Sequence, residues 1–109
     1  MPFSVLLTDD AARDIGELHE YIAQHDGPQK AGAVLDKIER LLHGPAKLPE
    51  RGSYPKELAA LGIREYRQVF FKPYRVIYRV IKKKVYIMLV VDGRRDMQTY
   101  LERRLLRAD

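Results

Sequence analysis

The side chains of this sequence that could carry chemistry are arginines and tyrosines in its second half. A guanidinium group presents a rigid fork of N–H donors that fits two phosphate oxygens, and a tyrosine can hydrogen-bond to a phosphate or stack on a base. Arg75 lies inside an alternating, strand-like stretch, and Arg94 and Arg95 follow the next such stretch. Tyr100 comes shortly afterwards, in a helical pattern. Other cations that could contact an anion are Arg67, Lys72 and Arg79.

Each of these residues also has a structural interpretation, which the sequence leaves open. Arg75 could instead pair with a carboxylate on the neighbouring strand, such as Glu65. Arg94 and Arg95 are flanked by aspartates, so a local salt bridge is an alternative to contact with a polyanion. Tyr100 has a spacing that is also typical of a residue at the rim of the core.

The charge of the chain is divided unevenly between its two parts. The 109 residues include 20 Lys and Arg and 15 Asp and Glu, which gives a formal net charge of +5. Residues 1–62 have a net charge of −3 and residues 63–109 a net charge of +8. We expect the basic part to attract a polyanion such as nucleic acid, or an acidic protein. Three arginines are expected to form a solvated helix face that adds unspecific attraction: Arg103, Arg104 and Arg107.

Composition and motifs exclude several function classes. The sequence has no cysteine, and its three histidines show no HxxxH or HxH spacing, so we expect neither a metal nor another cofactor. The GxSxG, P-loop, GxGxxG and HExxH motifs are also absent. The longest apolar run, Val85–Val91, has seven residues, far fewer than the ~20 that cross a bilayer. Residues 1–7 carry no export signal, so the sequence predicts a cytoplasmic protein without a membrane partner.

The first half of the chain predicts one strand followed by two amphipathic helices. Pro2–Leu7 alternates like a strand, and Thr8 is a suitable N-cap for the first helix. Asp26-Gly27-Pro28 ends this helix and permits a tight reversal, so that the second helix returns antiparallel to it. Gly44-Pro45 is expected to stop the second helix. The charged residues of the first helix that are expected to face water are Arg13, Asp14, Glu17 and Glu20.

The second half predicts strands joined by tight turns. After a surface crossing at residues 45–62, with one helical turn at Lys56–Leu61, the apolar pattern changes to a period of two. The expected strands are Ile63–Phe71, Tyr74–Ile81 and Val85–Val91. The last of these is apolar on both faces, which is typical of a central strand covered on both sides. Asp96 is a suitable cap for a final helix. Its apolar positions are Met97, Leu101 and Leu105.

These elements predict a small single α+β domain over residues 1–109, in the order β-α-α-β-β-β-α. The N-terminal strand and an antiparallel helical hairpin would pack on a mainly antiparallel four-stranded sheet, and a short helix would close the chain. Guanidinium groups from separate stretches can hold one phosphate only if they converge on one pocket. This convergence is therefore the central structural expectation for the site.

Three stretches of the sequence form a recognisable combination. They are the opening strand and helix from Val5 to Ile22, the stretch Pro73–Val80, and Val90–Asp96 with its Gly-Arg-Arg-Asp corner. In this order and spacing they resemble the RelE/ParE superfamily of toxins of type II toxin–antitoxin systems, over nearly the whole chain. The resemblance implies a compact toxin that a cognate antitoxin neutralises by wrapping around it, with contact to operator DNA only through the antitoxin. RelE-type members cleave mRNA in the ribosomal A site, whereas ParE-type members inhibit DNA gyrase without cutting RNA.

Our first hypothesis is the RelE type, a metal-free, ribosome-dependent mRNA endoribonuclease. By resemblance, Arg75 matches the arginine that holds the scissile phosphate, and Arg95, or Arg94, matches the one that stabilises developing charge. Tyr100 lies near the catalytic tyrosine of that type. The RNA 2′-hydroxyl would attack the adjacent phosphorus, while Tyr100 or Arg67 assists proton movement. A lysine pair of the RelE pattern is absent, and the expected RNA-binding residues here are Arg67, Lys72 and Arg79.

The alternative is a ParE-like gyrase inhibitor, which binds a protein and breaks no bond. The long helical hairpin and the closing segment from Arg95 to Leu105 favour this type. Under this hypothesis Arg75 would be structural or part of the antitoxin-binding surface. A third possibility is a superfamily member that has lost its toxicity.

Overall fold

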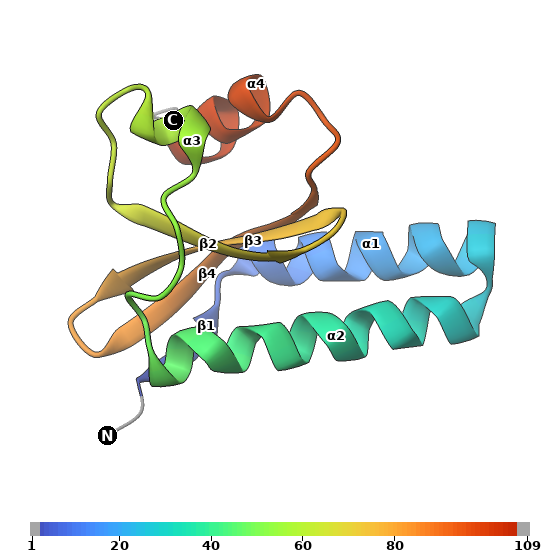
Figure 1. The fold of residues 1–109 in the computed structure, drawn as a ribbon. Coiled ribbons are helices and arrows are strands. Elements are labelled where there is room, and N and C mark those ends of the chain that lie inside the picture. The colour runs from blue at the N-terminus through green and yellow to red at the C-terminus, as the bar shows by residue number, and fades with distance from the viewer. Residues whose placement is uncertain (1–2, 107–109) are drawn as a thin grey trace.

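The computed structural model describes residues 3–106, which form a four-stranded sheet between two helical layers (Figure 1). The elements are β1 (Ser4–Leu7), α1 (Asp9–Asp26), α2 (Pro28–Lys47), α3 (Lys56–Ala59), β2 (Tyr66–Phe71), β3 (Tyr74–Ile81), β4 (Lys84–Asp92), α4 (Met97–Leu101) and a π-helical turn, η1 (Glu102–Leu106). The strand order is β1-β4-β3-β2, in which β1 runs parallel to β4 and the other pairs are antiparallel. The predicted α+β architecture is confirmed. Pro2 and Arg107, which the expected strand and helix face included, lie outside the described residues.

The two long helices begin and reverse as predicted. Thr8 Oγ1 accepts a hydrogen bond from the Ala11 N–H at 3.2 Å and so caps α1. Gly27 joins the helices at a φ of +95°, which favours glycine, and Pro28 begins α2. Figure 1 shows the helices side by side along one face of the sheet, with their connection projecting beyond it. No helix within residues 3–106 combines the length and the apolar composition that crossing a membrane requires.

The predicted stop of α2 at Gly44-Pro45 is wrong, because the helix continues to Lys47. Pro45 removes only its own N–H from the helical ladder, and its ring is fully buried, so apolar burial offsets the lost bond. The Leu48 N–H donates to the Gly44 carbonyl oxygen at 2.9 Å and closes the last turn.

Strand β4 is central and covered on both faces, as its apolar sequence predicts. A β-bulge places Met88 between the pairs Tyr78–Ile87 and Ile77–Leu89. The extra residue changes the phase of the alternation, so that Val85 and Ile87 before the bulge share a face with Val90 after it. One face packs against the helical hairpin through Val85, Ile87 and Val90, and the other packs against α3 and α4 through Leu89 and Val91.

The connection between α2 and β2 contains α3. Before α3 it is hydrogen-bonded to the sheet, and after α3 it is hydrogen-bonded to α3 itself. The buried Tyr78 hydroxyl donates to the Pro49 carbonyl oxygen at 2.7 Å and accepts from the Gly52 N–H at 3.1 Å. The predicted start of the second strand at Ile63 is wrong, because β2 begins at Tyr66. The Ile63 N–H donates instead to the Leu58 carbonyl oxygen at 3.0 Å, which keeps residues 60–63 in the turn after α3.

Candidate functional site

The guanidinium group of Arg75 is held by the buried carboxylate of Glu57 and the half-buried amide of Gln68. Its Nη1 and Nη2 donate to the two carboxylate oxygens of Glu57, each at 2.9 Å. Its Nε and Nη2 donate to Gln68 Oε1 at 2.8 and 2.6 Å. The side chains of Arg75 and Glu57 are 14% and 9% exposed. The predicted alternative partner Glu65 is wrong for Arg75, because it lies near Arg79 instead, at 3.6 Å.

The Arg75–Glu57 pair fastens the short helix α3 to strand β3. The hydrogen bond from Arg75 lowers the pKa of Glu57 below its ordinary value, against the opposing effect of burial. The stem of Arg75 passes close to Gly93, where a Cβ would stand 2.7 Å from Arg75 Cδ. Arg75, Lys72 and Arg94 line a shallow apolar cavity of about 490 Å³ beside the β2–β3 turn.

Arg94, Arg95 and Tyr100 line a second cavity, of about 520 Å³, between α1 and α4 at the end of β4. We call it the α1–α4 pocket. Arg94 pairs with Asp92 at 2.6 Å and is 77% exposed on its side chain. Its hydrogen bond lowers the pKa of Asp92. The Arg95 guanidinium lies 5.3 Å from the centre of the Tyr100 ring, within the range of a cation–π contact.

Arg104 is not on the solvated helix face that the sequence predicts. It donates through Nη1 and Nη2 to the two oxygens of Asp14, at 2.9 and 3.0 Å, and through Nη1 to Tyr100 Oη at 2.8 Å. Asp14 Oδ2 also accepts the Val90 N–H at 3.1 Å, next to the β-bulge. One carboxylate thus joins α1, β4 and the C-terminal helical segment. The expected solvent-facing role of Asp14 is wrong for this reason.

Sequence reasoning missed both buried carboxylates, but one of them left a signal. Asp14 lies three residues after Ala11 and four before Leu18, at the edge of the apolar stripe of α1. An acidic residue in that position needs a partner when the stripe is covered. Glu57 follows from no pattern, because it lies in a four-residue helix between irregular segments.

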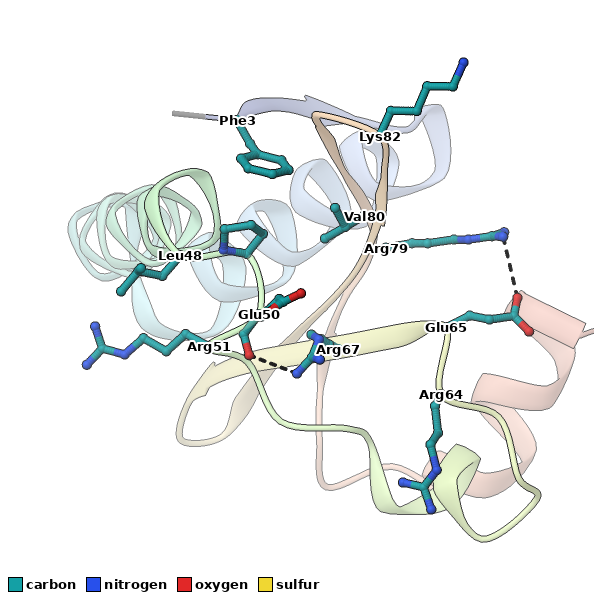
Figure 2. Close-up of a pocket in the computed structure, with 11 residues that line it drawn as sticks. Phe3, Leu48, Glu50, Arg51, Arg64, Glu65, Arg67, Arg79, Val80 and Lys82 are labelled. Atoms are coloured by element: carbon teal, nitrogen blue, oxygen red, sulfur yellow. Dashed lines mark hydrogen bonds and ion pairs between the residues drawn. The ribbon is translucent and has the colours of Figure 1, made fainter. Parts of the chain in front are cut away.

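Arg67 and Arg79 line a third cavity, of about 800 Å³, at the other end of the sheet (Figure 2). Arg67 Nη1 donates to the backbone carbonyl oxygens of Glu50 and Gly52 at 2.9 and 2.8 Å, and Nη2 donates to Tyr54 Oη at 2.9 Å. We call this cavity the cationic basin. Its cationic residues are Arg51, Arg64, Arg67, Arg79 and Lys82; its acidic residues are Glu50 and Glu65; its apolar floor is Phe3, Leu48 and Val80.

The predicted site residues therefore do not converge on one pocket. Arg75 and Lys72 line the shallow apolar cavity, Arg95 and Tyr100 the α1–α4 pocket, and Arg67 and Arg79 the cationic basin. Arg94 borders the first two of these cavities. The catalytic and RNA-binding roles of all seven residues stay predictions. Residues 3–106 hold no group of three or more His, Asp or Glu side chains that could bind a metal ion.

Every comparison with known proteins that follows finds a toxin or a toxin–antitoxin system. The family described as "ParE toxin of type II toxin-antitoxin system, parDE" matches residues 5–97. Toxin ParE3 of Caulobacter vibrioides is 27% identical over 97 residues, which cover 89% of this chain and 93% of that protein. A chain of a chromosomal ParDE system of P. aeruginosa superposes with a TM-score of 0.70 at 18% identity, covering 83% of this chain and 95% of the other. A chain of the RelBE2 toxin–antitoxin complex of Mycobacterium tuberculosis gives 0.56 at 22% identity, with coverage of 84% and 99%.

Proposed function

The chain belongs to the ParE family of toxins of type II toxin–antitoxin systems, and we propose that it arrests growth by binding DNA gyrase and not by cutting RNA. The observation that carries the proposal is the engagement of Arg75 by Glu57 and Gln68. A phosphate held by Arg75 would have to displace a buried carboxylate. Separating a buried ion pair costs about 3–5 kcal/mol, which makes Arg75 a poor phosphate ligand and a good structural clamp.

The separation of the other arginines supports the same proposal. Arg95 and Tyr100 face the α1–α4 pocket, whereas Arg75 lines a different cavity. Stabilisation of a phosphorane-like transition state needs donors that are already aimed at one set of oxygens. Arg67, Arg75 and Arg94 instead each donate to a local carboxylate or carbonyl group, and Arg95 lies over the Tyr100 ring.

We place the gyrase-binding surface at the α1–α4 pocket. It joins the helical hairpin and the C-terminal helical segment, the two elements that favoured the ParE type in the sequence. Its rim offers Tyr21, which is 61% exposed, together with Arg95 and Tyr100. Tyrosine and arginine are the residue types that dominate protein–protein hot spots. The Tyr21 ring is stacked on His25 at 4.1 Å between ring centres, which reduces the entropy that it would lose on binding.

A cognate antitoxin is the second proposed partner. The family is defined by two-component systems, and the RelBE2 relative was solved as a toxin–antitoxin complex. In this proposal the toxin contacts operator DNA only through the antitoxin.

Two assays on the purified chain test the proposed function. In a DNA supercoiling assay with gyrase we expect inhibition, and in a translation reaction with ribosomes and mRNA we expect no cleavage in the A site. Arg95→Ala should weaken gyrase inhibition by about tenfold if it lies in a hot spot. Arg40→Ala, an exposed arginine on α2, is the control and should leave inhibition unchanged. Cleavage of mRNA that is lost in both Arg75→Ala and Arg95→Ala would instead establish the RelE-type nuclease.

A further inference from the structure

We propose that Asp14 and Arg104 are positioning residues of the α1–α4 pocket. Through the ring of Tyr100, they hold the Arg95 guanidinium in the place where a partner protein meets it. This role rests on the proposed function, because it takes the α1–α4 pocket as the gyrase-binding surface. It connects recognition to an ion pair whose two side chains, Asp14 and Arg104, are only 11% and 18% exposed.

The ion pair is anchored where the edge of strand β4 loses its neighbour. Strand β1 ends at Leu7, and within residues 3–106 no other strand continues along this edge of β4. The Val90 N–H donates instead to Asp14 Oδ2 at 3.1 Å. The Met88 carbonyl oxygen accepts from Arg104 Nη2 at 3.3 Å. Because backbone groups at a covered edge need partners, the sheet fixes the place of both side chains.

The geometry of the pair extends this constraint to Tyr100. Arg104 donates to both oxygens of Asp14, and such a two-pronged contact fixes the plane of the guanidinium as well as its place. In this orientation Arg104 Nη1 also donates to Tyr100 Oη at 2.8 Å. The hydroxyl end of the half-buried Tyr100 ring therefore has a fixed partner.

The Tyr100 ring in turn orients Arg95. The centre of the ring lies 5.6 Å from the Arg104 guanidinium and 5.3 Å from the Arg95 guanidinium. Arg95 is exposed and forms no ion pair among the residues that the structure describes. Its contact with the ring face therefore limits the directions in which the guanidinium can point. A side chain that is ordered before binding loses less entropy when the partner arrives.

Arg104 also neutralises a charge that would compete for Arg95. The carboxylate of Asp14 lines the same cavity as Arg95. While Arg104 is paired with this carboxylate, Arg95 remains available to an acidic group of the partner. Without Arg104, the unpaired carboxylate would attract the Arg95 guanidinium into the pocket. Loss of Arg104 should therefore both release the ring and redirect Arg95.

Nuclear magnetic resonance of the purified chain tests the positioning without any partner. The ring current of Tyr100 shifts the side-chain Nε–Hε resonance of Arg95, and Arg95→Lys identifies this peak by removing it. Asp14→Asn keeps the size of the side chain and an oxygen for the backbone, but removes the charge that holds Arg104. Glu20→Gln makes the same change in charge at an exposed position of α1 and is the control.

The resonance of Arg95 should move toward that of a solvent-exposed arginine in Asp14→Asn, and stay in place in Glu20→Gln. Arg104→Lys should move it as well, because lysine keeps the charge but lacks the fork. This second variant tests the link from its other end if Asp14→Asn does not fold. An Arg95 resonance that is unchanged in the folded variants would overturn the proposal, whether or not the chain binds gyrase.

A double-mutant cycle with purified gyrase then tests whether Asp14 acts through Arg95. By isothermal titration calorimetry, Asp14→Asn should weaken binding by about fivefold in the wild-type background. In the Arg95→Ala background it should cause almost no further loss, because the group that it positions is already gone. The same fivefold loss in both backgrounds would overturn the proposal, since the ion pair would then act only on the fold. Absence of binding by the wild-type chain would refute the proposed function, while the Arg95 resonance would still decide the positioning.

Discussion

Replacing Arg75 by alanine tests directly whether this arginine is a structural clamp. The substitution would leave the Glu57 carboxylate 9% exposed and without its cationic partner. Removal of one member of a buried ion pair costs about 3–5 kcal/mol, a large part of the roughly 5–15 kcal/mol that stabilises a typical domain. At roughly 4–8 °C per kcal/mol for a small domain, the Tm should fall by roughly 12–40 °C.

Urea unfolding followed by circular dichroism measures this loss, and a double variant controls for it. Glu57→Leu/Arg75→Met removes both charges and keeps apolar volume, so it should recover most of the stability, because a buried pair replaced by apolar residues is often neutral. The structural assignment would be refuted if Arg75→Ala unfolded within about 1 kcal/mol of the wild type, the range of an exposed ion pair, and yet abolished toxicity. That result would return Arg75 to the role of a ligand-binding residue.

Three further predictions concern the same network and its surroundings. Because Arg75 lowers the pKa of Glu57 below its ordinary value of 4.5, the pair should stabilise the fold fully above about pH 4.5 and progressively less as the pH falls through the folded-state pKa; the stability difference between wild type and Glu57→Gln, measured by urea unfolding, should therefore shrink between pH 7 and pH 3. Gly52→Ala should destabilise the fold by about 1–3 kcal/mol, since the new methyl group would overlap the Tyr78 hydroxyl group, and an unchanged Tm would contradict the packing described. Arg94→Ala should change stability by less than about 1 kcal/mol, because its pair with Asp92 is exposed; a larger loss in the same unfolding assay would show that this corner matters more to the fold than its exposure indicates.

The elements of this fold follow from local sequence patterns to a large extent. The alternating pattern of Tyr74–Ile81 predicts that successive side chains lie on opposite faces of the sheet. In the structure the buried side chains of the two faces belong to two separate hydrophobic clusters. The cap at Thr8 and the reversal at Gly27 are equally local, since each depends on the chemistry of one or two residues. The proline in α2 misled the sequence analysis because its cost depends on burial, which only the tertiary structure supplies.

The candidate site could be predicted only in part. Residue types and strand positions singled out Arg75, Arg95 and Tyr100, which line two cavities in the structure, but they did not identify the partners of these side chains. The partner of Arg75 is 18 residues away in the short helix α3, and the partner of Arg104 is 90 residues away. No helical or strand periodicity in the sequence connects residues that are this far apart. The β-bulge in β4 also made the site hard to predict, because it determines on which face of the sheet each of the last residues of β4 lies.

The most direct test of the central claim is the binding of the purified chain to purified gyrase, measured by isothermal titration calorimetry. The claim is that this protein acts by binding another protein, and that its arginines mainly pair with groups of its own fold. It predicts a saturable complex that Arg95→Ala weakens and Arg40→Ala does not. A titration without binding, from a wild-type chain that still arrests growth and cleaves mRNA on ribosomes, would contradict it.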